Sequence, residues 1–250
     1  MAGAGRHVQK FADGRKIGFM RQRLADYRVF WRQFRQAYTS TGAVLPSGRG
    51  LALALSRFVR DDPTASIAKQ NGAAKGRRIL EVGPGTGAVT VQIIDDMRPN
   101  DRLVLVERNE QFVAHLRERL REIPTDQASR ERISLVHAAL EDLPDDEPFD
   151  VIVSGLPLNN FAVESVEQIL AKLRRLVAPG GTLSFFEYVA VRRAKSLVCS
   201  SSDRERLRGI ARVLGDFLKE EVKRDMVMAN VPPAWVHHVR PGQAPSEALP

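Results

Sequence analysis

The chain has 250 residues, of which 43% are hydrophobic and 27% are charged, which suits one α/β domain with a short extension and excludes two full domains. The single cysteine, Cys199, excludes an internal disulfide and favours a reducing compartment. No run of about 18 apolar residues occurs, and the N-terminus lacks the apolar core of a secretion signal, so we expect a cytoplasmic protein. The five histidines show no metal-ligand spacing, and we predict no metal site.

The net charge of +8 is concentrated near the N-terminus. Residues 1–40 contain nine Lys or Arg and two acids, a net charge of +7, and the other 210 residues together carry +1. A basic arm on a nearly neutral body indicates an anionic partner surface, either lipid headgroups or nucleic acid. No protein partner is predicted.

The basic arm also has an apolar stripe with helical spacing. Large apolar residues recur three or four positions apart, at Ile17, Met20, Leu24, Tyr27, Trp31, Phe34 and Tyr38, which is one face of a helix. Because arginines flank the stripe, the pattern is typical of a helix that lies in a membrane interface. Packing of the stripe onto the catalytic core is the alternative, and both can hold at once. We predict a basic amphipathic helical extension over residues 1–60.

The end of this extension and the segment after it are predicted from turn formers and apolar runs. Residues 41–50 are rich in turn formers and predict a loop, residues 51–59 predict a helix, and residues 61–75 predict an exposed connector.

Residues 78–87 read as a buried strand that runs into a glycine-rich turn. Glycines allow positive φ angles and a close approach of the backbone to a ligand. Gly83, Gly85 and Gly87 have the spacing G-x-G-x-G, whereas dinucleotide-binding enzymes have G-x-G-x-x-G. Glu81 precedes the first glycine by two residues, where its carboxylate would repel a pyrophosphate and attract a cationic amine.

A second predicted strand, over residues 103–107, ends in Glu107, which is 20 residues beyond Gly87. A carboxylate at this position can accept hydrogen bonds from both ribose hydroxyls of a nucleoside. A nucleoside that carries an ammonium group satisfies both acids, and S-adenosylmethionine is such a molecule.

Strands and helices alternate downstream of the turn. We predict helices over residues 89–97, 110–123, 163–177 and 203–220, and strands over residues 133–136, 150–154 and 182–188. This alternation predicts parallel strands with right-handed crossovers and a ligand beyond their carboxyl ends. Residues 222–231 and 234–240 are predicted to form a closing hairpin. The tail over residues 241–250 is rich in Pro, Ala and Gly and is predicted to be disordered.

The segment from Glu81 to Gly87, followed by Glu107, resembles the class I S-adenosylmethionine-dependent methyltransferases. The resemblance implies an α/β, Rossmann-like domain over residues 76–240, with a mostly parallel seven-stranded sheet, helices on both faces and an antiparallel C-terminal hairpin. It implies that Glu81 and the glycine turn with Thr86 hold the methionine end of the cofactor, that Glu107 holds the ribose, and that Ser154 is a further cofactor contact. A Rossmann-like domain that binds another nucleotide, or nothing, is the alternative.

The contact with adenine departs from the pattern of this family. Its members usually place an acid after the third strand to accept the adenine amino group. Ala139 occupies that position here. The adenine contact is therefore assigned either to Glu141 or to backbone groups of Ala139 and Leu140.

Transfer of a methyl group from a sulfonium is a direct displacement, so the choice of acceptor depends on the walls around the methyl group. In this family these walls include the segment after the fourth strand, here residues 154–161. Enzymes that methylate adenine amines carry N-L-P-Y or a relative there, in which a side-chain carbonyl accepts the amine protons and an aromatic ring stacks on the base. Gly155 and Leu158 occupy the matching positions and supply neither group, which favours an aliphatic acceptor.

Residues 154–161, residues 42–47 and the basic aromatic arm together resemble the soluble bacterial phospholipid N-methyltransferases, which convert phosphatidylethanolamine towards phosphatidylcholine. The resemblance implies a peripheral enzyme on an anionic membrane surface with a phospholipid substrate. Substrate contacts are assigned to Ser47, Arg49, Leu156, Pro157 and Leu158. Arg49 either meets the lipid phosphate or is a solvated loop arginine.

A headgroup ammonium must lose a proton before it attacks, which requires a base or a relay to water. Tyr38, at the end of the arm helix, and Tyr188, at the end of the fifth strand, are candidates by position. Two rival functions remain open. One is an RNA adenine N6-methyltransferase whose basic arm binds phosphates, and the other is a non-catalytic protein that binds S-adenosylmethionine at a membrane.

Overall fold

The computed structural model describes residues 46–61, 76–124, 126–189, 201–230 and 233–242. The predicted arm helix with Tyr38, most of the connector over residues 61–75 and most of the tail over residues 241–250 lie outside these residues.

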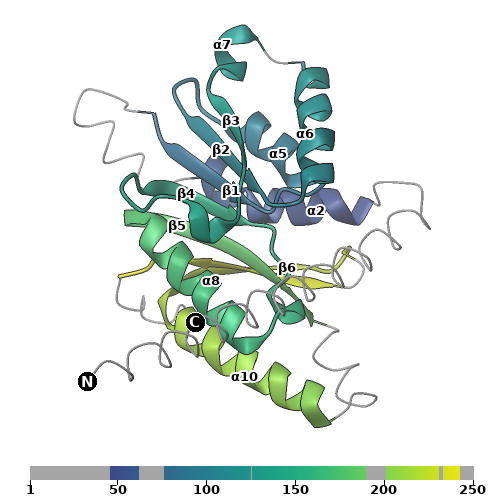
Figure 1. The fold of residues 1–250 in the computed structure, drawn as a ribbon, viewed down its shortest axis with the longest axis vertical. Coiled ribbons are helices and arrows are strands. Elements are labelled where there is room, and N and C mark those ends of the chain that lie inside the picture. Colours follow the sequence, from purple (N-terminus) through teal and green to yellow (C-terminus); the bar gives the residue numbers. More distant parts are fainter. Residues whose placement is uncertain (1–45, 62–75, 125, 190–200, 231–232, 243–250) are drawn as a thin grey trace, which may run out of the picture.

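A seven-stranded sheet in the order β3-β2-β1-β4-β5-β7-β6 forms the centre of the molecule (Figure 1). The first five strands pair in parallel, and β7 is antiparallel to both β5 and β6. This confirms the prediction of a Rossmann-like sheet that is closed by an antiparallel hairpin. The strands are β1 (Arg78–Val82), β2 (Arg102–Glu107), β3 (Ile133–His137), β4 (Phe149–Ser154), β5 (Val177–Tyr188), β6 (Glu221–Val227) and β7 (Ala234–Val239).

Helices cover both faces of the sheet because residues on its inner strands are apolar on both sides. Leu80 faces α8 and α10 in one core cluster, and its neighbour Ile79 faces α2, α3 and α5 in the other. The α-helices are α2 (Pro46–Leu55), α3 (Arg57–Arg60), α5 (Ala88–Asp96), α6 (Glu110–Glu122), α7 (Gln127–Arg130), α8 (Val163–Leu176) and α10 (Ser201–Phe217). The described residues also form the short 3-10 helices η1 (Leu140–Asp142), η2 (Leu158–Asn160) and η3 (Leu218–Glu220).

The prediction of a loop over residues 41–50 is wrong at its end, because α2 already includes Pro46 to Gly50. Tertiary packing overrides the weak helix propensity of the glycines here. A Cβ atom on Gly50 would lie 3.2 Å from Cγ1 of Val227, so glycine lets α2 lie close to β6. Leu55 and Val59 are fully buried in the cluster shared with α5. Residues 46–60, predicted as part of an extension, are thus packed against the sheet.

The fifth strand begins at Val177, five residues before the predicted strand. The helix predicted over residues 163–177 is α8, which ends at Leu176, and the chain continues directly as strand. The early residues of β5 pair with β4 across a register shift between Phe149 and Val151. A Cβ atom on Gly181 would lie 2.9 Å from the Asp150 carbonyl oxygen, so the glycine permits this close pairing.

Candidate active site

The turn after β1 depends on glycine for two reasons. Gly83, Gly85 and Gly87 have φ angles of 67°, 58° and 78°, which are strained for residues with a Cβ atom. The turn is also tightly packed, because a Cβ atom on Gly83 would lie 2.8 Å from Cδ2 of Leu156 and one on Gly87 would lie 3.0 Å from Cδ2 of Leu116. The structure thus confirms the expected positive φ angles.

Glu81 lies at the end of β1 and is 1% exposed. Its Oε2 accepts a hydrogen bond of 2.7 Å from Thr90 Oγ1, and its Oε1 is buried without a hydrogen-bond partner. Burial raises the pKa of Glu81 to about 8, and the nearby charge of Glu107 acts in the same direction, against the hydrogen bond from Thr90. A carboxyl group with a vacant buried oxygen is suited to a cationic donor, because a cation favours its ionised form.

Glu107 ends β2 and is also fully buried. Its Oε2 accepts from the backbone N–H of Gly85 at 3.2 Å, and its Oε1 accepts from that of Asn109 at 2.8 Å. The carboxylate therefore ties the glycine turn to the start of α6, where Asn109 caps the helix by accepting from Gln111 and Phe112.

A cavity opens beyond the carboxyl ends of the parallel strands, between the glycine turn and the start of α8. It is lined by Val82, Gly83, Val106, Arg108, Ala138, Ala139, Leu140, Glu141, Leu156, Phe161, Ser165 and Ile169. The structure thus brings the residues assigned to adenine together with the glycine turn and with Leu156. Three lining residues were not predicted from the sequence. They are Arg108, which directly follows Glu107, and the pair Ser165 and Ile169, whose spacing of four places them on one face of α8.

The segment after β4, residues 154–161, is called the acceptor segment because it is predicted to form walls around the methyl group. It packs against the glycine turn and the core. Ser154 is buried, and its Oγ accepts from the Leu156 N–H at 3.4 Å. A Cβ atom on Gly155 would lie 2.7 Å from the Gly83 carbonyl oxygen, so the backbone of the glycine turn excludes a side chain there. Pro157 is buried, and Leu158 is 1% exposed and belongs to the core between the sheet and α8. Of the predicted substrate contacts in this segment, Leu156 lines the cavity.

The other predicted site residues are not among the lining residues of the cavity or lie outside the described part of the chain. Thr86 is half-buried within the turn. Arg49 is exposed on α2, and the side chain of Ser47 lies outside the described part of the chain. Tyr188 packs edge-on against Phe186 with ring centroids 5.1 Å apart, on the sheet face opposite α8. Burial raises the pKa of the Tyr188 phenol, which makes it a weaker candidate for the proton acceptor.

No group of three or more His, Cys, Asp or Glu side chains that could hold a metal ion occurs among the described residues. Within the same part of the chain, every helix is too short or too polar to cross a membrane.

Residues 79–181 match the protein family described as "Methyltransferase domain". The chain is 28% identical to the ornithine lipid N-methyltransferase of Singulisphaera acidiphila over 167 residues, which are 64% of this chain and 77% of that enzyme. It is 32% identical over 119 residues to a ubiquinone/menaquinone biosynthesis C-methyltransferase of Stutzerimonas stutzeri. That match covers 47% of this chain and 44% of the relative, so less than half of that enzyme is spanned.

Two solved structures share the fold. The 1,6-didemethyltoxoflavin-N1-methyltransferase of Burkholderia thailandensis, bound to S-adenosylhomocysteine, has a TM-score of 0.58 at 14% identity and is matched over 90% of both chains. The magnesium protoporphyrin IX methyltransferase of Synechocystis PCC 6803, with bound S-adenosylmethionine, has a TM-score of 0.52 at 14% identity, over 84% of this chain and 90% of that one.

Proposed function

Since this chain is a class I S-adenosylmethionine-dependent methyltransferase, we propose that its acceptor is the amine of a phospholipid headgroup. The enzyme then converts phosphatidylethanolamine towards phosphatidylcholine at a membrane surface. The relative from Singulisphaera acidiphila, which is named for N-methylation of a lipid, supports a lipid amine. The basic arm over residues 1–40 supports attachment to anionic lipid.

The packing of Gly155 is the observation that carries this proposal. An enzyme that methylates an adenine amine needs a hydrogen-bond acceptor and a stacking ring around the extruded base. The Gly83 carbonyl oxygen leaves no room for a side chain on Gly155, and Leu158 is committed to the core. A small aliphatic amine requires neither group.

The residues around the glycine turn fit S-adenosylmethionine. The vacant buried Oε1 of Glu81 suits the ammonium of its methionine end, the glycines allow close backbone approach, and the cavity between Leu156 and Ala139 suits the adenine. When bound, the cofactor supplies a methyl group on a sulfonium, which reacts with a neutral nucleophile. The chain's own residues hold the methionine end, exclude water from the apolar part of the cavity and orient the acceptor.

The test uses the purified full chain with labelled S-adenosylmethionine and vesicles that contain phosphatidylethanolamine and an anionic lipid. We expect label in mono-, di- or trimethylated lipid, identified by mass spectrometry. Transfer to structured RNA with none to lipid would establish the RNA methyltransferase. Cofactor binding without transfer to either would favour a non-catalytic role. Flotation with the vesicles, compared between anionic and neutral lipid, tests the membrane attachment separately.

A further inference from the structure

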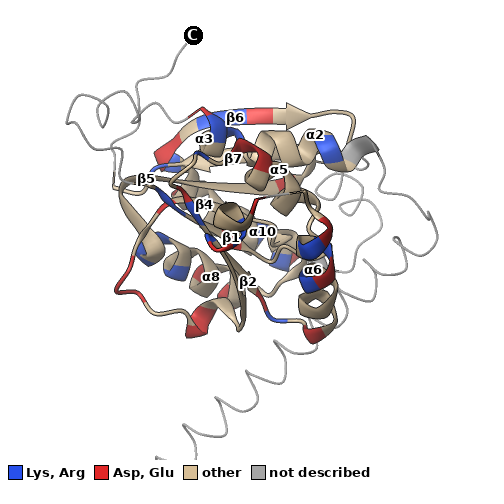
Figure 2. Cartoon of the chain, turned by 90° about the horizontal axis from the view of Figure 1, so that it is seen from above, with Lys and Arg blue, Asp and Glu red and all other residues tan. Residues whose placement is uncertain are grey.

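The hairpin half of the sheet contains a second group of ionisable side chains, away from the glycine turn. Glu187 on β5 is 8% exposed and His237 on β7 is 2% exposed. Glu221 and Arg224 on β6, the edge strand, complete the group. Figure 2 shows acidic and basic residues in colour along β6. His237 pairs with Phe185 across β5 and β7, and Glu187 pairs with Trp235, so both ionisable side chains point to the α8 and α10 face.

The two nitrogens of His237 have different surroundings. Nδ1 lies 2.6 Å from Glu221 Oε1. Burial opposes ionisation of Glu221, but hydrogen bonds from Arg224 and His237 outweigh it and lower the pKa of this carboxyl group. An ionised Glu221 can only accept, so in a neutral His237 Nδ1 carries the proton and Nε2 is the proton acceptor. Nε2 is buried, has no hydrogen-bond partner and lies 3.7 Å from Glu187 Oε1.

Glu187 lies beside the acceptor segment. Ser154, the last residue of β4, pairs with Phe185 on β5. Because β4 and β5 are parallel, Glu187 lies two residues further toward the carboxyl end, at the level of Leu156, which lines the cavity. Glu187 is therefore an acid at the end of the sheet where the cavity opens, although it is not one of the residues that line the cavity.

We propose that Glu187, His237 and Glu221 form a proton relay that deprotonates the acceptor ammonium. This inference rests on the proposed amine acceptor. The N–H bond of the ammonium breaks, its electron pair stays on nitrogen, and the proton forms an O–H bond with Glu187. Glu187 passes this proton to Nε2 of His237, and the resulting imidazolium is balanced by the ionised Glu221. Glu187 and His237 carry the proton, and Glu221 is a positioning residue.

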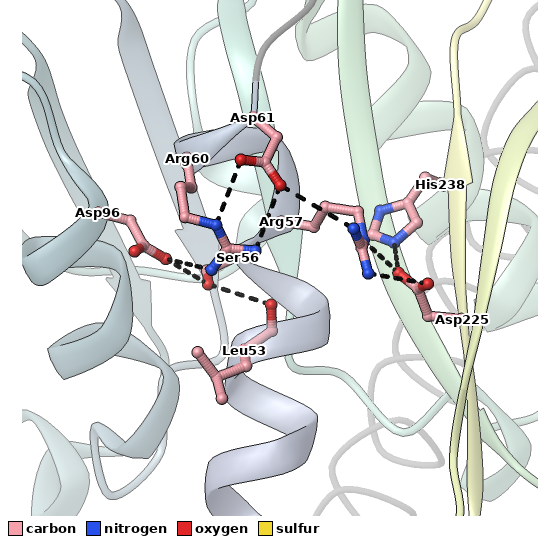
Figure 3. A network of polar contacts seen from close by, with 8 residues as sticks. All are labelled: Leu53, Ser56, Arg57, Arg60, Asp61, Asp96, Asp225 and His238. Atoms are coloured by element: carbon pink, nitrogen blue, oxygen red, sulfur yellow. Dashed lines mark hydrogen bonds and ion pairs between the residues drawn. The ribbon is translucent and has the colours of Figure 1, made fainter.

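The adjacent His238 provides a matched contrast on the opposite face of β7. Its Nδ1 lies 2.8 Å from Ser184 Oγ and its Nε2 lies 3.2 Å from Asp225 Oδ2. Arg57 holds Asp225 through two hydrogen bonds of 2.5 and 3.0 Å (Figure 3). Burial lowers the pKa of His238 to about 4, so it stays neutral near pH 7. Both ring nitrogens of His238 therefore have hydrogen-bond partners, whereas Nε2 of His237 has none.

The test compares E187Q, H237N and the control H238N in the full chain, with phosphatidylethanolamine vesicles and labelled S-adenosylmethionine from pH 6 to 10. We expect E187Q to lower kcat about 100-fold at neutral pH, and H237N about 10-fold. The rate of E187Q should recover about tenfold per pH unit, because only amine deprotonated in solution then reacts. H238N should keep the wild-type pH profile. Charged groups that face His237 come from β5 and β6, namely Glu187, Glu221 and Arg224.

A second measurement does not depend on activity or on the folding of E187Q. In histidine-labelled protein, the nitrogen signals that disappear in H237N should report a proton on Nδ1 and a bare Nε2. A proton on Nε2 with a bare Nδ1 would overturn the relay. Wild-type pH profiles in E187Q and H237N would also overturn it, and so would a change in the pH profile of H238N as large as theirs. If the wild-type chain does not methylate the lipid amine, the proposed function fails, and the relay as stated fails with it. If the wild-type chain methylates the lipid amine and the variants keep its pH profile, the relay fails but the proposed function stands.

Discussion

The two halves of the sheet each contain a polar site, and the residues of these sites differ in how far apart they lie in the sequence. In the half formed by β1 and β2, the buried carboxylates and the glycine turn all lie between residues 81 and 107. In the half formed by β5, β7 and β6, partners are remote in sequence: Arg57 and Asp225 are 168 positions apart, and Ser184 and His238 are 54 positions apart. A site built from one strand and its turn leaves a continuous pattern in the sequence, whereas a site built across a hairpin does not.

Removing Glu107 should have the largest effect on the cofactor half. E107A leaves the N–H groups of Gly85 and Asn109 without their acceptor, which we expect to cost about 2–4 kcal/mol of unfolding free energy. The dissociation constant of S-adenosylmethionine should rise at least roughly 100-fold, because the turn and the ribose lose the same group. Urea unfolding and calorimetry measure the two effects. E118A, an exposed change on α6, serves as control and should change stability by less than about 0.5 kcal/mol.

A pair of glycine variants can separate the effect of close packing in the glycine turn from the strain that a positive φ angle causes in any alanine. G83A and G180A both place an alanine at a left-handed position, with φ angles of 67° and 76°, which costs about 1–2 kcal/mol in each. Only Gly83 is also crowded, by Leu156, whereas nothing lies within 4 Å of a Cβ atom on Gly180. G83A should therefore be the less stable variant and should weaken cofactor binding more than about tenfold. Equal cofactor affinities in the two variants would contradict the assigned site.

The contrast between the local glycine turn and the hairpin site explains which parts of the structure can be predicted from the sequence. The spacing of Glu81, Gly83 and Glu107 requires one strand, one turn and the next strand, and the structure has all three. The role of Leu158 does not follow from its position in a motif, because its burial depends on how η2 meets α8. Arg108 and Ser165 likewise reach the cavity through the arrangement of β2 and α8. The vacancy on His237 depends on the register of β5, β7 and β6, which no local pattern specifies.

Glu81 should make the stability of the cofactor-free protein depend on pH. Its pKa is raised from 4.5 to about 8. Its stabilising contribution to the free energy of unfolding is therefore fully present below pH 4.5 and is lost as the pH rises through 8. Between these values the unfolded chain ionises first, and the slope approaches about 1.4 kcal/mol per pH unit. E81Q, which mimics the protonated group, should flatten this slope. Urea unfolding at pH 5.5, 7 and 8.5 measures it.

Cofactor binding should then release a proton at pH 7, because the ammonium of the ligand favours ionised Glu81. Calorimetry in two buffers of different ionisation enthalpy counts this proton. E81Q should release none, and an identical count in both proteins would show that Glu81 does not meet the ammonium.

The smallest effect concerns the link between α3 and the hairpin. R57A removes two hydrogen bonds to Asp225, and because Arg57 is one-third exposed we expect a loss of about 1 kcal/mol at pH 7.5 with unchanged cofactor affinity. The charge of Arg57 also helps to hold the pKa of His238 near 4, so R57A should raise it toward the unfolded value. A histidine whose folded pKa is lowered makes stability rise with pH up to its unfolded pKa. R57A should weaken this rise, and its destabilisation should be smaller at pH 5 than at pH 7.5. R57K keeps the charge and should keep the wild-type pH dependence, which separates the electrostatic contribution from the lost hydrogen bonds.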